Sequence, residues 1–171
     1  MRKTRLLAAV VLATYSLAMV GCGDDDDDSE DFEANLTAAA EVNPPVGNPT
    51  ATGTANLVLE DRVLTVTVDV TGNTTSNITM AHIHGPAAAG VNAGIVLDFV
   101  PSMTAVIAAN TRTGRIVSAS FDLDALTVSA TGVLRIAADE LIAMLNNGTA
   151  YVNVHTQSNP GGEIRGQILD D

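Results

Sequence analysis

The sequence is poor in the residues that build disulfides and aromatic binding surfaces. It has one cysteine, no tryptophan, two tyrosines and three phenylalanines among 171 residues. A single cysteine excludes an intramolecular disulfide, so the core must hold without covalent cross-links. The chain also lacks the nucleophile-elbow motif of hydrolases, a Walker-type phosphate loop and the glycine fingerprint of dinucleotide-binding folds. These absences favour a protein that is not an enzyme.

Basic residues are also scarce, and lysine is absent after Lys3. The chain holds 8 basic and 20 acidic residues, and three of the basic residues lie within positions 1–21. Without those 21 residues, five arginines face 20 acids, which gives a net charge of −15. A chain with this charge is repelled by nucleic acid and by anionic lipid headgroups, which excludes both classes as partners.

The first 21 residues have the pattern of an export signal. Basic residues precede an apolar run from residue 6 to residue 21, which is too short for a membrane span. Small Gly21 directly before Cys22 predicts a lipoprotein signal peptide over residues 1–21, with Cys22 lipidated as the membrane anchor of an extracytoplasmic protein. A plain secretory signal or an uncleaved anchor is the alternative. Gly23, where some bacteria use aspartate to retain lipoproteins at the inner membrane, favours the outer membrane of the cell envelope.

A run of acidic residues follows the cysteine. Residues 22–31 are charged and lack apolar periodicity, so they cannot bury enough surface to offset the entropy lost on ordering. We predict that they form a disordered acidic tether that holds the next domain away from the membrane. The remaining residues, 32–171, are enough for one core and too few for two ordinary domains.

Residues 32–171 consist mainly of short runs of Val, Ile, Thr and Leu separated by Gly, Asn, Pro and Asp. This composition predicts an all-β domain of about 7–9 antiparallel strands, folded as a sandwich or barrel. The clearest unit is a hairpin over 51–72, with its turn at 60–62. Further strands are expected at 32–39, 77–84, 94–100, 115–121 and 130–136, and in both arms of 151–168. Only Ala138–Asn146 has a helical period, which predicts one short helix across an end of the sheets.

The three histidines of the chain fall in two motifs. His82 and His84 alternate along the strand expected in MAHIHGP, and His155 lies in the C-terminal hairpin. Residues at i and i+2 of a strand point the same way, so two imidazoles can meet one ion, and a neighbouring strand can supply a third. Three neutral imidazoles form a known zinc arrangement and also suit copper. The alternative is that these histidines hydrogen-bond to loops and edge backbone without an ion.

The C-terminal hairpin, YVNVHTQSNPGGEIRGQI, has an apolar side and a polar side. The polar side includes Asn153, His155, Glu163 and Arg165, and it is either a solvated sheet surface or the wall of a site. Glu163 is a weaker metal candidate, as a fourth ligand or as the group that orients a histidine. Arg165 is expected to form an exposed pair with Asn153 or with neighbours of Glu163, or to bind a ligand carboxylate.

Five stretches, in their order and spacing, resemble the CHRD domain, a module named after chordin and common in microbial secreted proteins and lipoproteins. They are FEANLTAAAEVNPPV, TATGTANLVL, MAHIHGPAAAGVNAGIVLDF, ADELIAMLNNG and YVNVHTQSNPGGEIRGQI. The resemblance covers nearly all of residues 32–171 and implies an immunoglobulin-like β-sandwich or barrel. It implies little chemistry, because bacterial members have no established activity and animal members are extracellular regulators of growth factors.

Two functional hypotheses follow. The first is a membrane-tethered, extracytoplasmic CHRD-domain lipoprotein that acts as a non-enzymatic binding or structural module for an unknown protein or small-molecule partner. The second is a metal-binding protein that holds zinc or copper through His82, His84 and His155, with or without redox or hydrolytic activity. Convergence of the three imidazoles on one point would separate the two hypotheses.

Overall fold

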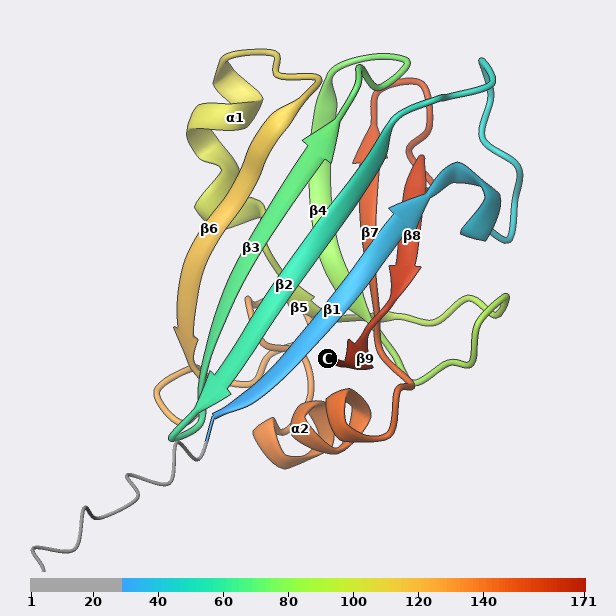
Figure 1. Ribbon diagram of the computed structural model, residues 1–171. Helices are drawn as coiled ribbons and strands as arrows, with labels where there is room; N and C mark the ends of the chain where they lie inside the picture. The colour runs from blue at the N-terminus through green and yellow to red at the C-terminus, as the bar shows by residue number, and fades with distance from the viewer. Residues whose placement is uncertain (1–28) are drawn as a thin grey trace, which may run out of the picture.

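The computed structural model describes residues 29–171, in which nine strands form one antiparallel sheet with short helices around it (Figure 1). The strand order is β5-β4-β7-β8-β1-β2-β3-β6, and β9 pairs with β1. The strands are β1 Glu30–Thr37, β2 Thr52–Glu60, β3 Val63–Thr71, β4 Ile78–His84, β5 Ile95–Asp98, β6 Gly114–Asp122, β7 Tyr151–Thr156, β8 Ile164–Gln167 and β9 Leu169–Asp170. The helical segments are η1 Ala38–Ala40, η2 Val100–Met103, α1 Thr104–Ala108 and α2 Ala138–Asn146.

The sheet curls on itself into a half-barrel. In Figure 1, β1, β2, β3 and β6 lie in front of β4 and β7, and the apolar side chains of the two halves form one core. Leu57 and Val66 from the front half and Ile83 and Val152 from the rear half are fully buried. The predicted all-β class is therefore confirmed, and its strands follow one continuous hydrogen-bonded path.

The hairpin predicted over residues 51–72 consists of β2 and β3. Glu60 pairs with Val63, which leaves Asp61 and Arg62 as a two-residue turn with φ values of 47° and 65°. Positive φ at both positions is the mark of a type I′ turn, whose twist matches that of the flanking strands.

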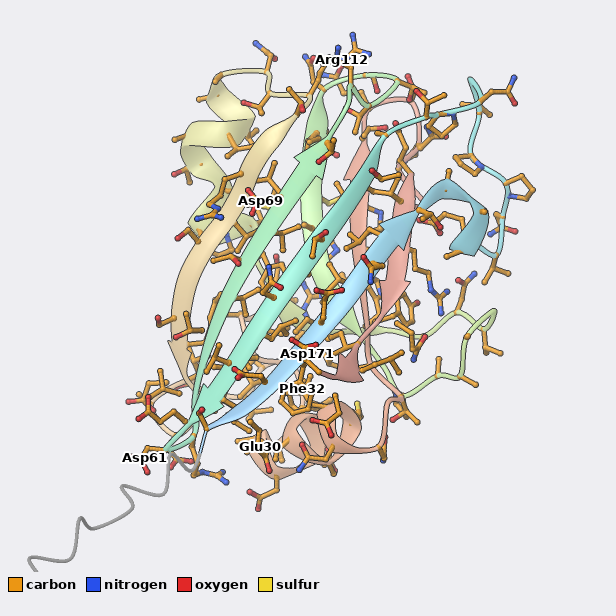
Figure 2. All side chains as sticks on the ribbon, in the orientation of Figure 1. Glu30, Phe32, Asp61, Asp69, Arg112 and Asp171 are labelled. Atoms are coloured by element: carbon orange, nitrogen blue, oxygen red, sulfur yellow. The ribbon has the colours of Figure 1, made fainter. Side chains whose placement is uncertain are left out.

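The outer face of β3 and β6 is polar (Figure 2). The hydroxyls of Thr65 and Ser120 lie 2.9 Å apart across the two strands, and Arg115 donates to the carboxylate of Asp69 at 2.8 Å. Exposed cross-strand pairs of this kind contribute only ~0.2–1 kcal/mol. Their larger effect is on register, because a slip by one residue would turn these polar side chains into the core.

Helix α2 has the predicted bounds and lies across one end of the half-barrel (Figure 1). Leu141 and Leu145 bury the apolar side of the helix against the core. Asp139 and Glu140 stand in the first turn, where the free amides of a helix N-terminus attract negative charge.

One predicted strand is absent, and two short helices were not predicted. No strand forms over 130–136, where Leu134 makes only isolated bridges to Leu97 and Val128. The segment crosses the edge of β5, which has only four residues and offers little backbone to pair with. The short helices η2 and α1 were not predicted, because five residues of α1 are too few to display a helical period.

The predicted start of the domain was also late by two residues. Glu30 and Asp31, assigned to the tether 22–31, pair with Leu59 and Val58 as the first residues of β1. Strand pairing satisfies their backbone groups while both side chains stay exposed, so local acidity does not prevent order here. The rest of that prediction, with the signal peptide 1–21 and Cys22, lies outside the described residues. Within residues 29–171, no helix is long and apolar enough to span a membrane.

Candidate metal centre

The polar side of the C-terminal hairpin is buried, so it is not a solvated surface. Every residue of β7 is buried, and Arg165 on β8 is only 1% exposed. Backbone carbonyls of two loops reach this layer, from Ala93 to His84 and from Pro160 to His155. The strands thus place polar side chains in an enclosed layer between the sheet and its loops.

The pairing of β4 with β7 gathers the three histidines in this layer. His82 and His84 alternate with core residues on β4, and the adjacent β7 carries His155. Their exposures are 3%, 8% and 5%, respectively. One possible ligand atom from each residue lies within 4.8 Å of the other two, so the structure brings together the three residues that the sequence singled out.

The separations are close to those of a metal-bound set. Nδ1 of His82 lies 3.1 Å from Nε2 of His155. Two nitrogens bound to one tetrahedral zinc at about 2.1 Å would be about 3.4 Å apart. Three atoms within 4.8 Å of one another can all lie within about 2.8 Å of a shared central point, so ring movements of about 0.7 Å complete the coordination.

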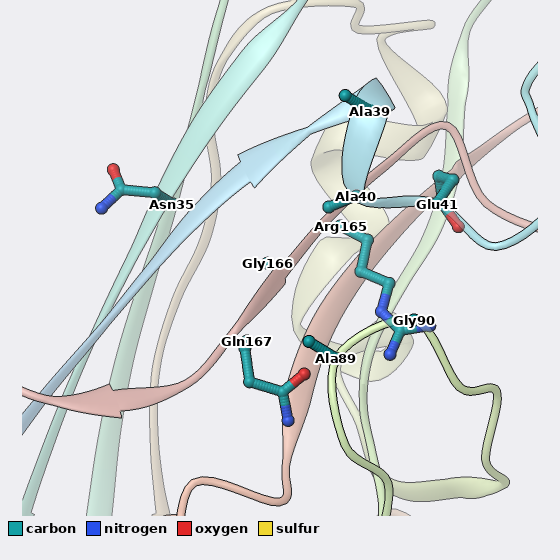
Figure 3. A pocket seen from close by; sticks show the side chains of 9 residues that line it. All are labelled: Asn35, Ala39, Ala40, Glu41, Ala89, Gly90, Arg165, Gly166 and Gln167. Atoms are coloured by element: carbon teal, nitrogen blue, oxygen red, sulfur yellow. The ribbon is translucent and has the colours of Figure 1, made fainter.

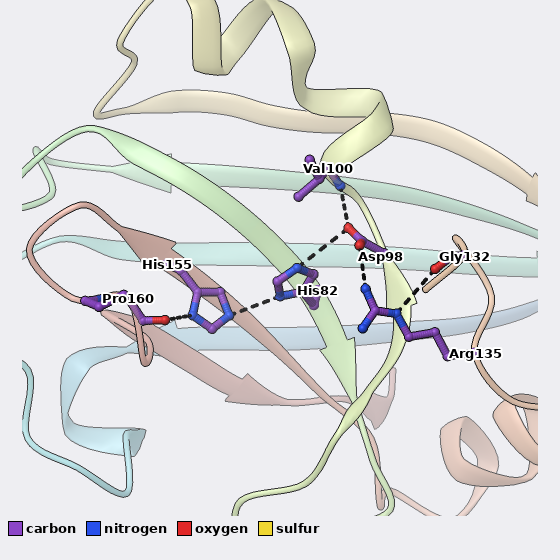
Figure 4. A network of polar contacts seen from close by, with 7 residues as sticks. All are labelled: His82, Asp98, Val100, Gly132, Arg135, His155 and Pro160. Carbon is purple, nitrogen blue, oxygen red and sulfur yellow. Dashed lines mark hydrogen bonds and ion pairs between the residues drawn. The ribbon is translucent and has the colours of Figure 1, made fainter. Parts of the chain in front are cut away.

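Backbone carbonyls outside the cluster hold the other ring nitrogen of two of the histidines. Nδ1 of His155 lies 3.1 Å from the carbonyl of Pro160 (Figure 4). Nδ1 of His84 lies 3.1 Å from the carbonyl of Ala93. A carbonyl only accepts, so both histidines carry their proton on Nδ1 and keep a lone pair on Nε2. Nε2 of His84 is buried and has no hydrogen-bond partner in the described residues. This orphaned atom is available to an ion.

The surroundings keep the imidazoles neutral. The pKa of His82 is lowered to about 4, chiefly by burial and also by the neighbouring His155, while Asp98 acts to raise it. Burial likewise lowers the pKa of His155 to about 4, with His84 acting in the same direction. Burial also lowers the pKa of His84. Neutral imidazole is the form that binds a metal, so all three are ready ligands at pH 7.

Glu163 does not belong to this cluster. Its carboxylate accepts hydrogen bonds from the amide and hydroxyl of Thr75 at 2.6 and 2.5 Å, from the Thr156 hydroxyl at 2.6 Å and from the Asn159 amide at 2.9 Å. Burial acts to raise the pKa of Glu163, but these hydrogen bonds outweigh it and lower the pKa. Glu163 therefore ties the β7–β8 turn to the loop before β4.

Arg165 forms a buried stack instead of an exposed pair. Its guanidinium lies 3.4 Å from the ring centre of Tyr151, and that ring stacks on His84 with centres 5.0 Å apart and planes 7° apart. Arg165 also donates to the carbonyl of Val91 at 2.8 Å and to Asn92 at 3.2 Å. The stack fixes the orientation of the His84 ring.

A cavity of about 310 Å³ opens beside Arg165 (Figure 3). Its lining residues are Asn35, Ala39, Ala40, Glu41, Ala89, Gly90, Arg165, Gly166 and Gln167. Burial raises the pKa of Glu41 to about 7, although Arg165 and a hydrogen bond from Asn153 act to lower it. Oε1 of Glu41 and Oδ1 of Asn153 are both buried without a hydrogen-bond partner in the described residues. Both atoms are acceptors, and protonation of Glu41 turns its carboxyl group into a hydrogen-bond donor.

Sequence reasoning did not single out Asp98. Asp98 is opposite His82 in the β4–β5 pairing, and its carboxylate lies 3.6 Å from Nε2 of that histidine. A signal was present, since Asp98 ends the strand that follows the H-x-H motif. Antiparallel pairing of those two strands was needed to use it.

The CHRD domain family model matches residues 32–168, which include all three histidines and the hairpin. The chain belongs to the CHRD domain family. A segment of 39 residues is 56% identical to chordin of Danio rerio, and it covers 23% of this chain and 4% of chordin. The chain therefore corresponds to a small part of that protein. No solved structure matches. CHRD domains occur in extracellular proteins such as chordin, which agrees with an extracytoplasmic location.

Proposed function

We propose that this protein is a CHRD lipoprotein of the bacterial cell envelope, anchored through Cys22, that binds a transition-metal ion through His82, His84 and His155. The observation that carries the metal-binding proposal is that one ring nitrogen from each of three buried histidines lies within 4.8 Å of the other two. Membership of the CHRD family supports an extracellular binding module, and in our proposal the ion is its ligand.

The donor set indicates the class of ion. Three imidazole nitrogens without a thiolate suit zinc or copper and give little affinity for calcium or magnesium, which prefer oxygen ligands. A three-histidine site leaves one coordination position for water or another ligand. We propose ion binding rather than catalysis, because Asp98, the one carboxylate within residues 29–171 that is ion-paired with the cluster, is already paired with Arg135.

Calorimetric titration with Zn²⁺ and Cu²⁺ tests the proposal. We expect wild type to bind one ion per chain, and His84→Ala to bind at least about tenfold more weakly, because it loses a ligand while keeping the strand. Thr65→Ala is the control, since it shortens an exposed side chain on the outer face of β3, away from the cluster. Equal affinity of wild type and His84→Ala would contradict the proposal.

A further inference from the structure

A carboxylate and a guanidinium reach the histidine cluster from the side of β5 (Figure 4). We infer that Asp98, held in place by Arg135, is a positioning residue that makes His82 present its Nδ1 lone pair to the ion. This inference rests on the proposed function, because it assigns the group that orients one of the three ligands.

The sheet register brings Asp98 to His82. The two residues are direct partners across β4 and β5, and Oδ1 of Asp98 lies 3.6 Å from Nε2 of His82. The carboxylate is held on two sides. Oδ1 accepts a hydrogen bond from the amide of Val100 at 2.9 Å, and Oδ2 accepts one from Nη2 of Arg135 at 2.9 Å. Arg135 is itself fixed by donation from Nε to the carbonyl of Gly132 at 3.3 Å. Asp98 therefore has little freedom to turn away.

His82 is the one ligand whose tautomer depends on a side chain. Backbone carbonyls fix the tautomers of His84 and His155, as described above. In contrast, Nδ1 of His82 faces Nε2 of His155 at 3.1 Å, and without an ion one of these two atoms must carry a proton. An ion can bind both atoms only when the His82 proton sits on Nε2, where Asp98 is the acceptor.

The approach of Asp98 is suited to this role. A separation of 3.6 Å is too long for a hydrogen bond, and a ring rotation that moves Nε2 by about 0.6 Å brings it to about 3.0 Å from the carboxylate. A carboxylate bonded to the outer N–H of a metal-bound histidine typically changes metal affinity by about 10–100-fold when it is removed.

Asp98→Asn tests the inference, because an amide has one acceptor oxygen where the carboxylate has two. The asparagine side chain cannot accept from Arg135 on one side and from His82 and Val100 on the other. We expect Zn²⁺ affinity to fall about 10–100-fold. In the zinc-loaded wild type, nitrogen-15 NMR should show the His82 proton on Nε2, and Asp98→Asn should lose the downfield shift of that proton.

Asp122→Asn is the matched control. Like Asp98, Asp122 accepts a hydrogen bond from the backbone amide two residues later in the chain, at 3.1 Å. It lies at the end of β6, the edge strand opposite β5. Arg135→Gln is a second variant, which keeps the carboxylate and releases its anchor, and should weaken Zn²⁺ binding severalfold. Circular dichroism identifies any variant that fails to fold.

The outcomes separate the two proposals. Wild type that binds no Zn²⁺ would overturn the proposed function. Wild type that binds Zn²⁺ while folded Asp98→Asn binds it as tightly as Asp122→Asn would overturn the role of Asp98 alone. If Asp98→Asn does not fold, the affinity of Arg135→Gln decides, and a value equal to that of wild type overturns the inference.

Discussion

Individual atoms at the candidate centre show why burial and hydrogen bonding must be considered together. Burial alone would make three imidazoles costly in the core, since each has a donor and an acceptor to satisfy. Here carbonyls outside the cluster accept hydrogen bonds from the Nδ1–H groups of His84 and His155. The Nε2 lone pairs of both rings therefore remain inside the cluster. Within residues 29–171, Nε2 of His84 is buried without a hydrogen-bond partner, so this lone pair is free to accept a donor or an ion.

Glu41 offers a residue-scale prediction of pH dependence. Its pKa is raised to about 7 in the folded protein from an ordinary value of 4.5, so between these pH values the folded state holds a proton that the unfolded state releases. Its contribution to stability is therefore complete below about pH 4.5 and is lost as the pH rises through 7. We expect wild type to lose about 1 kcal/mol relative to Glu41→Gln between pH 4.5 and 8, after allowance for solvent screening.

Urea unfolding at several pH values measures this difference. Glu60→Gln, at an exposed position beside the β2–β3 turn, removes the same charge and corrects for the general effect of net charge. A constant difference between wild type and Glu41→Gln across this pH range would contradict the prediction.

At the scale of elements, the β7–β8 hairpin depends on its turn. Gly162 has a φ of +127°, which side chains rarely allow, and the adjacent Glu163 holds the turn against Thr75, Thr156 and Asn159. The turn also carries Pro160, whose carbonyl orients His155. The turn of this hairpin therefore also sets the orientation of His155.

Glu163→Gln should destabilise the fold without removing a metal ligand. The amide nitrogen of glutamine would face donors where the carboxylate accepts four hydrogen bonds, so we expect a loss of about 2–3 kcal/mol in the free energy of unfolding. Urea unfolding measures the loss, with Glu60→Gln as the control for charge. Zn²⁺ titration of the folded variant should give an affinity close to that of wild type. A large loss of affinity at wild-type stability would instead identify Glu163 as a ligand.

The elements differ in how far the sequence predicted them. β2 and β3 were predictable because strict alternation and a two-residue turn are local signals. Helix α2 was predictable because Leu141 and Leu145 recur at helical spacing. The segment 130–136 also alternates, yet it forms no strand because the backbone it meets is the edge of the short β5. Alternation indicates a strand only where a partner of matching length is present.

At the scale of the whole molecule, the acidic composition suits a protein held near a membrane without binding its headgroups. Acidic side chains are repelled by anionic headgroups. In our proposal, the lipid on Cys22 makes the membrane contact.

Cys22→Ala tests this anchor. We expect the wild-type chain, expressed in a bacterium with the lipoprotein pathway, to fractionate with membranes and to gain the mass of its lipid. We expect Cys22→Ala to lack the lipid mass and to be absent from the membrane fraction. The replacement of Ser29 by Ala is a control outside the signal. The same fractionation for wild type and Cys22→Ala, without a lipid mass in either, would contradict the anchor.

The sequence by itself determined the all-β class, the helix α2, the two histidine motifs and the family to which they belong, because these depend on local periodicity and on motif order. Only the tertiary structure decided that the polar side of the hairpin is buried, that His155 meets His82 and His84, and that Glu163 lies outside the cluster while Asp98 touches it. The physical reason is strand pairing. Residues about 70 positions apart become neighbours through the register of β4 with β7, and no local pattern specifies which strands will pair.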